Sequence, residues 1–117
     1  MSDSTAKIEE SRRLRIKADA YFKEKSPAFR AFQDMAAKAF KPGVLGTAVK
    51  ELMAMAISIC VKCEPCIDYH VREALRHGAT EEQIVEAIEV AIDMGGGPAT
   101  VQARFAMECM EYDRKGK

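Results

Sequence analysis

Two cysteines, a histidine and a glutamate fall within a stretch of twenty residues near the middle of the chain. Cys63 and Cys66 form a Cys-x-x-Cys pair, and His70 follows four residues after the second thiol. Such a pair can cycle, because one sulfur is oxidised to a sulfenic acid and the other condenses with it, releasing water. A histidine one helical turn away can carry the proton. These residue types therefore indicate thiol redox chemistry.

The positions of the four residues suggest what each could do. Cys66 comes directly after Pro65, a residue that suits the first turn of a helix. The free amide groups and the dipole at a helix start favour the thiolate, which is the reactive form of cysteine. Glu51 lies on an apolar stretch, where a lone carboxylate is costly to bury and needs a partner. If the helix carrying His70 folds back, the imidazole is the natural partner.

The apolar periodicity and the capping residues predict an all-α chain of six helices. Helix starts are indicated by Ser26-Pro27 and by Thr80 with Gln83, and Gly78 indicates a helix end. The predicted helices cover residues 3–25, 27–40, 46–62, 65–77, 81 to the glycine run at 95–97, and 98–113.

The apolar stripes indicate which surfaces are covered. The second helix has apolar residues at three- and four-residue steps, which predicts a core or a subunit interface. They are Phe29, Phe32, Met35, Ala36 and Phe40. The third helix is apolar nearly all round, which predicts burial on most sides. The first helix is rich in charge, and its face with Leu14, Tyr21 and Phe22 is predicted to be largely solvated. Cys60 and Cys109 fit apolar helix faces and are predicted to be core residues.

Size and composition predict one domain over residues 1–117, with 1–25 as a charged N-terminal helix. Since 18 basic and 18 acidic residues balance, neither nucleic acid nor an anionic membrane is an expected partner. The N-terminus has no apolar segment typical of a signal peptide, and no apolar run approaches the roughly 20 residues of a membrane span. A cytoplasmic location is expected, where a close cysteine pair is more often catalytic, redox-active or metal-binding than structural.

The pattern Glu-x11-Cys-x2-Cys-x3-His resembles the core motif of the alkylhydroperoxidase AhpD-like branch of the carboxymuconolactone decarboxylase family. The segments HVREALRHGATEEQIVEA and DMGGGPA are also similar to this family, so the resemblance covers about residues 45–110. It implies an AhpD-like helical bundle that assembles as a homo-oligomer, a trimer or a hexamer. It also implies a peroxidase that reduces small hydroperoxides through the cysteine pair.

By this resemblance, Cys66 corresponds to the thiol that attacks peroxide and Cys63 to the resolving thiol. Glu51 and His70 correspond to the proton relay. The resemblance implies no bound cofactor, and reducing equivalents would come from an external dithiol or a lipoyl-type carrier protein. One departure is that Pro65 stands where well-characterised members carry a further histidine.

Two other readings stay open at the level of sequence. The family also contains lyases that decarboxylate a small lactone acid without relying on a cysteine pair. Alternatively, the pair could belong to a non-enzymatic module, either a redox sensor or a zinc clip with His70 as a third ligand. Retention of both cysteines favours the redox branch.

Overall fold

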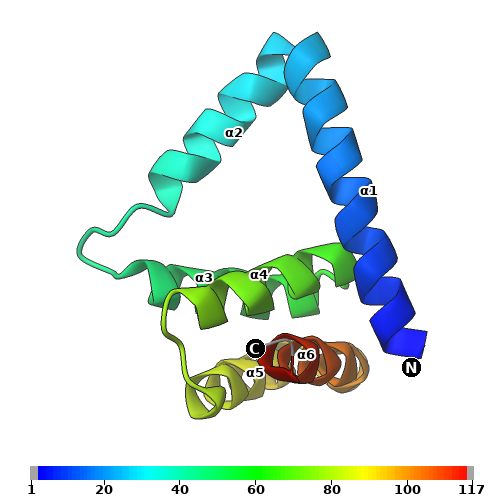
Figure 1. Cartoon of the computed structure of the whole chain (residues 1–117). Helices are drawn as coiled ribbons and strands as arrows, with labels where there is room; N and C mark the ends of the chain where they lie inside the picture. The colour runs from blue at the N-terminus through cyan, green and yellow to red at the C-terminus, as the bar shows by residue number, and fades with distance from the viewer. Residues whose placement is uncertain (1–2, 116–117) are drawn as a thin grey trace.

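The chain folds entirely into α-helices joined by short turns. The computed structural model describes residues 3–115, and this part of the chain contains no β-strand. Its helices are α1 (Asp3–Lys25), α2 (Pro27–Ala39), α3 (Thr47–Cys60), α4 (Glu64–Arg76), α5 (Glu81–Gly95) and α6 (Gly97–Lys115) (Figure 1). The predicted all-α fold with six helices is confirmed.

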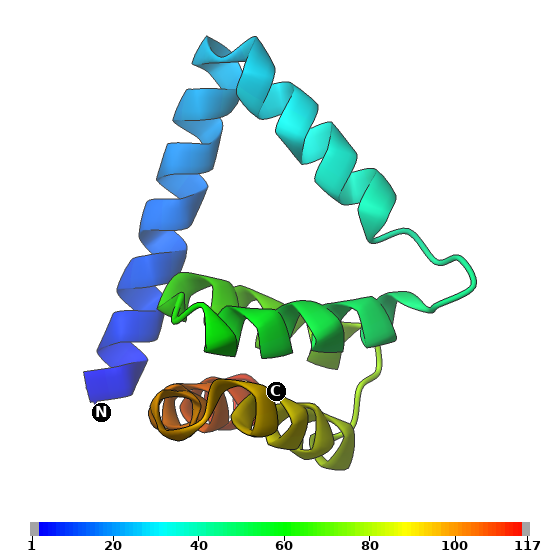
Figure 2. The same ribbon diagram turned by 180° about the vertical axis from the view of Figure 1, so that it is seen from behind.

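The helices α3 to α6 form the packed body of the molecule. Helix α3 packs on α4 and α5, α4 also packs on α6, and α5 packs on α6. In Figures 1 and 2, α3 and α4 form one layer and α5 and α6 the other. The core between them consists mainly of small and aliphatic side chains, which include Met55, Ile59, Ile67, Val71, Ala74, Ile84, Ala91, Ala106 and Cys109.

Helices α1 and α2 form an arm that stands out from this body. The start of α1 lies beside the body, where Ile8 is fully buried, and α1 and α2 meet at a corner away from the other helices (Figures 1 and 2). Helix α2 packs mainly against α1, and none of its residues is buried. Phe32 and Met35 are 61% and 56% exposed. The predicted core role of this apolar stripe is therefore wrong within one chain, and its role as a subunit interface stays a prediction.

A further prediction of burial needs correction. Helix α3 is covered on one face only, since Val49, Met53 and Ile57 are exposed. Its buried residues are Glu51, Met55, Ser58 and Ile59. An apolar stretch predicts burial, but it does not say that the covering surface belongs to the same chain.

The predicted caps form as expected. The Ser26 hydroxyl accepts a hydrogen bond from the Phe29 amide at 3.0 Å, which caps the start of α2. Thr80 and Gln83 bond reciprocally in a capping box at the start of α5. Gly78 has a φ of 99°, the left-handed conformation that ends α4. These local signals fix where the helices begin and end.

A buried cluster of charges fastens α1 to the body. The Arg12 guanidinium donates to both carboxylate oxygens of Asp68 on α4, at 3.1 and 2.8 Å, and to Asp113 on α6 at 2.9 Å. Burial acts to lower the pKa of Arg12, but these hydrogen bonds outweigh it and raise the pKa above its ordinary value. Burial raises the pKa of Asp113, and Arg12 offsets this only in part. Asp113 therefore ionises at a cost in the folded protein.

We expect the two carboxylates to differ in their effect on stability. Asp68→Asn should lower the free energy of unfolding by about 3 kcal/mol, because Asp68 is buried and makes two charged hydrogen bonds. Asp113→Asn should cost no more than about 1 kcal/mol, because the substitution also removes a carboxylate that is penalised by burial. Denaturant unfolding of both variants measures the difference.

The pH dependence provides a further check on Asp113. A carboxyl group whose pKa is raised by folding favours the folded state at low pH, and this contribution is lost as the pH rises through the folded pKa. The stability of the wild type relative to Asp113→Asn should therefore fall as the pH rises through that range. A larger cost for Asp113→Asn than for Asp68→Asn would contradict this account.

Candidate active site

The turn between α3 and α4 determines where the first cysteine lies. The amide of Cys63 donates to the carbonyl of Ser58 at 3.0 Å, and the amide of Lys62 donates to that of Ile59 at 3.2 Å. This pair of bonds is a Schellman motif, in which the residue with left-handed backbone is usually glycine. Here Lys62 takes that conformation, with a φ of 60°. The turn leaves Cys63 as the residue that caps the start of α4.

The two cysteines of the pair are joined. Cys63 and Cys66 form a disulfide with a Cα–Cα distance of 5.2 Å. The Sγ of Cys63 also accepts a hydrogen bond from the amide of Cys66 at 3.3 Å, so the same sulfur caps the helix. Helix α4 begins at Glu64, one residue earlier than predicted, because Cys63 can serve as this cap. Cys66 thus lies in the first turn, where a thiolate is stabilised when the disulfide opens.

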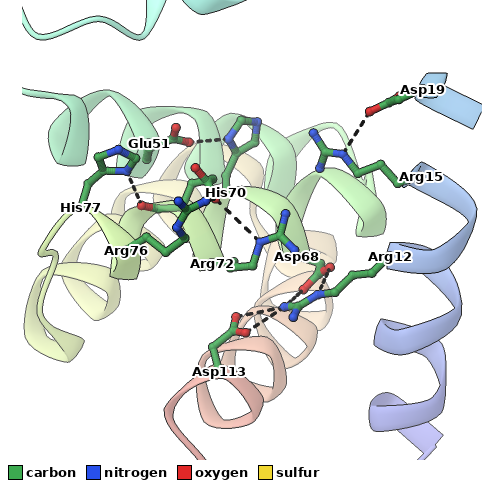
Figure 3. Close-up of polar contacts among 11 residues, drawn as sticks. Arg12, Arg15, Asp19, Glu51, Asp68, His70, Arg72, Arg76, His77 and Asp113 are labelled. Carbon is green, nitrogen blue, oxygen red and sulfur yellow. Dashed lines mark hydrogen bonds and ion pairs between the residues drawn. The ribbon is translucent and has the colours of Figure 1, made fainter. Parts of the chain in front are cut away.

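Glu51 and His70 form the hydrogen bond that the sequence suggested. The Nδ1 of His70 lies 2.7 Å from Oε1 of Glu51 (Figure 3). Glu51 is 4% exposed, and it reaches the imidazole from the buried face of α3. Since the carboxylate accepts this bond, Nδ1 carries a hydrogen and Nε2 is the nitrogen that can take or give a proton. His70 lies one helical turn after Cys66, on the same face of α4.

Aromatic rings fix the orientation of the His70 imidazole. The ring of Phe40 stacks on it, with centroids 5.6 Å apart and an angle of 15° between the planes. The ring of Tyr69 meets it edge-on at 5.1 Å. The guanidinium of Arg15 on α1 lies over the Tyr69 ring at 3.3 Å, a cation–π contact that connects the arm to the site. The imidazole is therefore held by α2, α3 and α4 together.

Backbone tethers hold the end of α2 near this histidine. The Nζ of Lys50 donates to the carbonyls of Ala39 and Lys41, at 2.9 and 2.6 Å. The hydroxyl of Thr47 donates to the carbonyl of Phe40 at 2.8 Å. Both donors lie in the first turns of α3, close to Glu51 in the sequence. The segment that carries Phe40 is thus fastened to the helix that carries the carboxylate.

A pocket of about 840 Å³ opens over Cys66 and His70. One wall consists of α2 and the residue that caps its end, which contribute Phe29, Phe32 and Phe40. Another wall consists of residues from α3 and α4. Arg15, Asp19 and Lys41 place charges on its lining. Of the two disulfide-bonded residues, the lining includes Cys66 but not Cys63. A small molecule entering the pocket would therefore meet Cys66 first.

Comparison of the sequence with known protein families gives a match over most of the chain. The sequence model of the carboxymuconolactone decarboxylase family matches residues 26–108. The chain belongs to this family. The matched segment includes the four candidate residues, so the resemblance seen in their spacing is confirmed at the level of the family.

Three curated relatives are similar over different shares of the chain. A Cupriavidus necator protein is 42% identical over 80 residues, which are 68% of this chain and 71% of the relative. A Paracoccus denitrificans protein from a cox locus is 40% identical over 69% of this chain and 73% of its own length. The alkyl hydroperoxide reductase AhpD of Corynebacterium kroppenstedtii is 34% identical over 48% of this chain but only 32% of its own length.

Two crystal structures of family proteins have the same fold. Apo-lpg0406 from Legionella pneumophila superposes with a TM-score of 0.85 and 31% identity, over 96% of this chain and 98% of its own. TM1620 from Thermotoga maritima gives a TM-score of 0.84 and 26% identity, over 91% of both chains. The arm formed by α1 and α2 lies within this shared extent, so it belongs to the family fold.

The remaining two cysteines lie outside the pocket. Cys109 is fully buried, as predicted, and burial raises the pKa of its thiol, which keeps it protonated and unreactive. The prediction that Cys60 is a core residue is wrong, because this residue is exposed at the end of α3. Its thiol donates to the carbonyl of Ala91 at 3.5 Å.

Two polar residues of the pocket were not predicted to belong to the site. Glu73 is 7% exposed. His77 stands next to Gly78 at a helix end, a position that predicts a favourable charge at the helix end or a surface residue; it is exposed but also lines the pocket. One carboxylate oxygen each of Glu51 and Glu73 and one ring nitrogen of His77 lie within 4.8 Å of one another. The signal in the sequence was the spacing of Glu73 and His77 from Cys66, at seven and eleven residues, which returns to one helix face.

Two further observations bear on metals and membranes. In the disulfide, Cys63 and Cys66 have no thiolate to offer a metal, and the group of potential ligands found among residues 3–115 contains neither of them. This arrangement does not favour the zinc clip. No helix in the described part of the chain is both long and apolar enough to cross a bilayer.

Reduction of the disulfide should leave the protein folded. Cys63 and Cys66 are three residues apart, so the closed loop is short and loop-closure entropy contributes only about 2 kcal/mol. Denaturant unfolding with and without excess dithiol should show a loss of stability no larger than this, and the double variant Cys63→Ser, Cys66→Ser should not respond to dithiol. Global unfolding on reduction would show that the disulfide is structural and cannot serve a catalytic cycle.

Proposed function

We propose that the protein is a thiol-dependent peroxidase, or a closely related disulfide oxidoreductase, acting on hydroperoxides. The observation that carries the proposal is that Cys66, bonded to Cys63, lines the same pocket as a histidine held by a buried carboxylate. A dithiol–disulfide pair supplies two electrons, and the Glu51–His70 pair handles protons. Membership of a family that includes AhpD-like enzymes supports the same chemistry.

In the proposed reaction, the Cys66 thiolate attacks the nearer oxygen of the hydroperoxide. The O–O bond breaks, the sulfur becomes a sulfenic acid, and His70 Nε2 donates a proton to the leaving alkoxide. The thiol of Cys63 then condenses with the sulfenic acid, which forms the disulfide and releases water. Glu51 acts through His70: it orients the ring and stabilises the imidazolium.

The oxidised enzyme must be reduced from outside. We expect a dithiol or a lipoyl-type carrier protein to attack the partly exposed disulfide, as the family resemblance implies, without a bound cofactor. A cytoplasmic location is expected, since Cys60 and Cys109 are unpaired thiols and such thiols persist in a reducing compartment. These statements about the reductant and the compartment belong to the proposal.

The proposed partner for assembly is a second copy of the chain. Apolar side chains on α2 and α3 lie exposed on one chain, among them Phe32, Met35, Met53 and Ile57. Exposed apolar surface of this kind is typical of a protein interface. A trimer or a hexamer is the expected assembly, and light scattering of the purified protein measures it.

The deciding experiment is hydroperoxide consumption with a dithiol as the reductant. Cys66→Ser should abolish turnover. Cys63→Ser, reduced beforehand and assayed without the dithiol, should consume about one equivalent and stop at the sulfenic acid, where the wild type stops at the disulfide. His70→Gln should slow turnover on the order of a hundredfold, the usual range for loss of a general acid–base group. Cys60→Ser is the matched control, because it removes a thiol outside the pocket, and it should retain wild-type turnover.

The same variants separate the proposal from a lyase. If the wild type and Cys66→Ser consume hydroperoxide equally, the peroxidase proposal is wrong. Turnover of a lactone acid by the variants lacking both cysteines would instead identify a decarboxylase that does not use the pair.

A further inference from the structure

One face of α4 carries ionisable side chains that the proposed reaction does not use. Cys66, His70, Glu73 and His77 follow one another at steps of four, three and four residues, and all four line the pocket. These steps place side chains in one row along a helix. The proposed reaction uses the first two and leaves Glu73 and His77 without a role.

Glu51 connects the two halves of this row. Its carboxylate bonds to His70 Nδ1 at 2.7 Å, and a carboxylate oxygen of Glu51 lies within 4.8 Å of the Glu73 carboxylate and of the His77 ring. A separation of this size is spanned by one water molecule, with two hydrogen bonds of ordinary length. In Figure 3, the side chain of Glu51 lies between those of His70 and His77, and His77 stands at the end of α4.

We propose that Glu73 and His77 extend the His70–Glu51 pair into a proton path, which exchanges protons between the partly buried imidazole of His70 and solvent. His77 is the exposed end of the path, and Glu73 is the buried intermediate. The inference rests on the proposed thiol chemistry and assigns two more residues to it. Both are positioning and proton-transfer residues, and neither needs to touch the peroxide.

The proton balance of the cycle requires such an exchange. The reactive Cys66 thiolate has already lost its proton to solvent, so Cys66–S⁻ + ROOH + H⁺ gives Cys66–SOH + ROH. Condensation with the Cys63 thiol then gives the disulfide and water. Reduction by a dithiol returns the Cys63 thiol, the Cys66 thiolate, the oxidised carrier and one proton. One proton therefore enters and one leaves in each cycle, while substrate or carrier occupies the pocket beside His70.

The contacts of His77 and Glu73 suit this role. The Nδ1–H of His77 donates to the backbone carbonyl of Glu73 at 2.9 Å, which leaves Nε2 free to take up or release a proton. The Glu73 carboxylate is held by Arg76 at 2.8 Å, and the Nε of Arg72 lies 3.7 Å away. The carboxylate is thereby fixed in place between Glu51 and His77.

The test compares two variants of the path with a matched control. His77→Asn keeps a group that can bond to the helix carbonyl but removes the titrating ring, and Glu73→Gln keeps the shape of the side chain. Glu86→Gln is the matched control, because it makes the same change at an exposed glutamate of α5 that does not line the pocket. Stopped-flow rates of peroxide oxidation and of disulfide reduction by dithiothreitol are measured in dilute buffer, with and without added imidazole.

In dilute buffer, His77→Asn and Glu73→Gln should slow both half-reactions about tenfold, the lower end of the effect of an acid–base group. Glu86→Gln should change them less than about twofold. Added imidazole should restore His77→Asn, because a dissolved base can replace the exposed end of the path. It should not accelerate the wild type. A structural effect of the substitution would not respond to imidazole.

Several results would overturn the inference. These are wild-type rates in His77→Asn, a slow His77→Asn that imidazole does not restore, or equal losses in Glu73→Gln and Glu86→Gln. A stoichiometric metal ion in the purified protein, lost in both path variants, would make the cluster a metal site instead. If Glu73→Gln does not fold, His77→Asn decides alone, since His77 is exposed.

The proposed function can fail separately. If the wild type does not react with hydroperoxide, the peroxidase proposal fails, and reduction of the disulfide by dithiothreitol still tests the path.

Discussion

The geometry of the site depends on one buried carboxylate that must be neutralised. Glu51 lies on the covered face of α3, where an unpaired charge would cost several kcal/mol. His70 meets that need from α4 at 2.7 Å. Because the bond joins two helices, neither can rotate without breaking it, and the orientation of the imidazole follows. The hydrogen bond that offsets the cost of burying Glu51 is thus also the one that orients His70 for the proton transfer in the proposed reaction.

A second constraint lies in the turn that joins these helices. The left-handed conformation of Lys62 ends α3 and makes Cys63 the cap of α4. The sulfur of Cys63 then has two partners, the sulfur of Cys66 and the amide of Cys66. The helix start thus has its acceptor from one member of the disulfide itself. In the proposed cycle, a Cys63 sulfur that stayed beside this amide would cap α4 in the reduced form as well.

The sequence predicted the features that depend on neighbouring residues along the chain. Caps such as Ser26 and Thr80 fixed the helix ends, and spacing together with the cost of burying Glu51 identified the group around Cys66. The sequence could not predict which apolar stripes are buried within a single chain. The stripe of α2 indicates that another surface covers it, but not whether that surface belongs to the same chain or to a second one. A left-handed Lys62 carries no local signal, because glycine is the usual residue there. Glu73 was missed because a glutamate on a helix is ordinarily solvated.

The pocket wall is the least buried element of the fold, and this links access to Cys66 with assembly. Helix α2 has no buried residue, yet it supplies Phe29 and Phe32 to the pocket, and the residue that caps its end, Phe40, also lines it. It is held at one end by the Phe22–Phe29 contact and at the other by Phe40 against His70. Apolar side chains that remain exposed to water are costly in free energy. A second chain that covers α2 in the proposed homo-oligomer would therefore also fix the wall facing Cys66, so that pocket and interface share one helix.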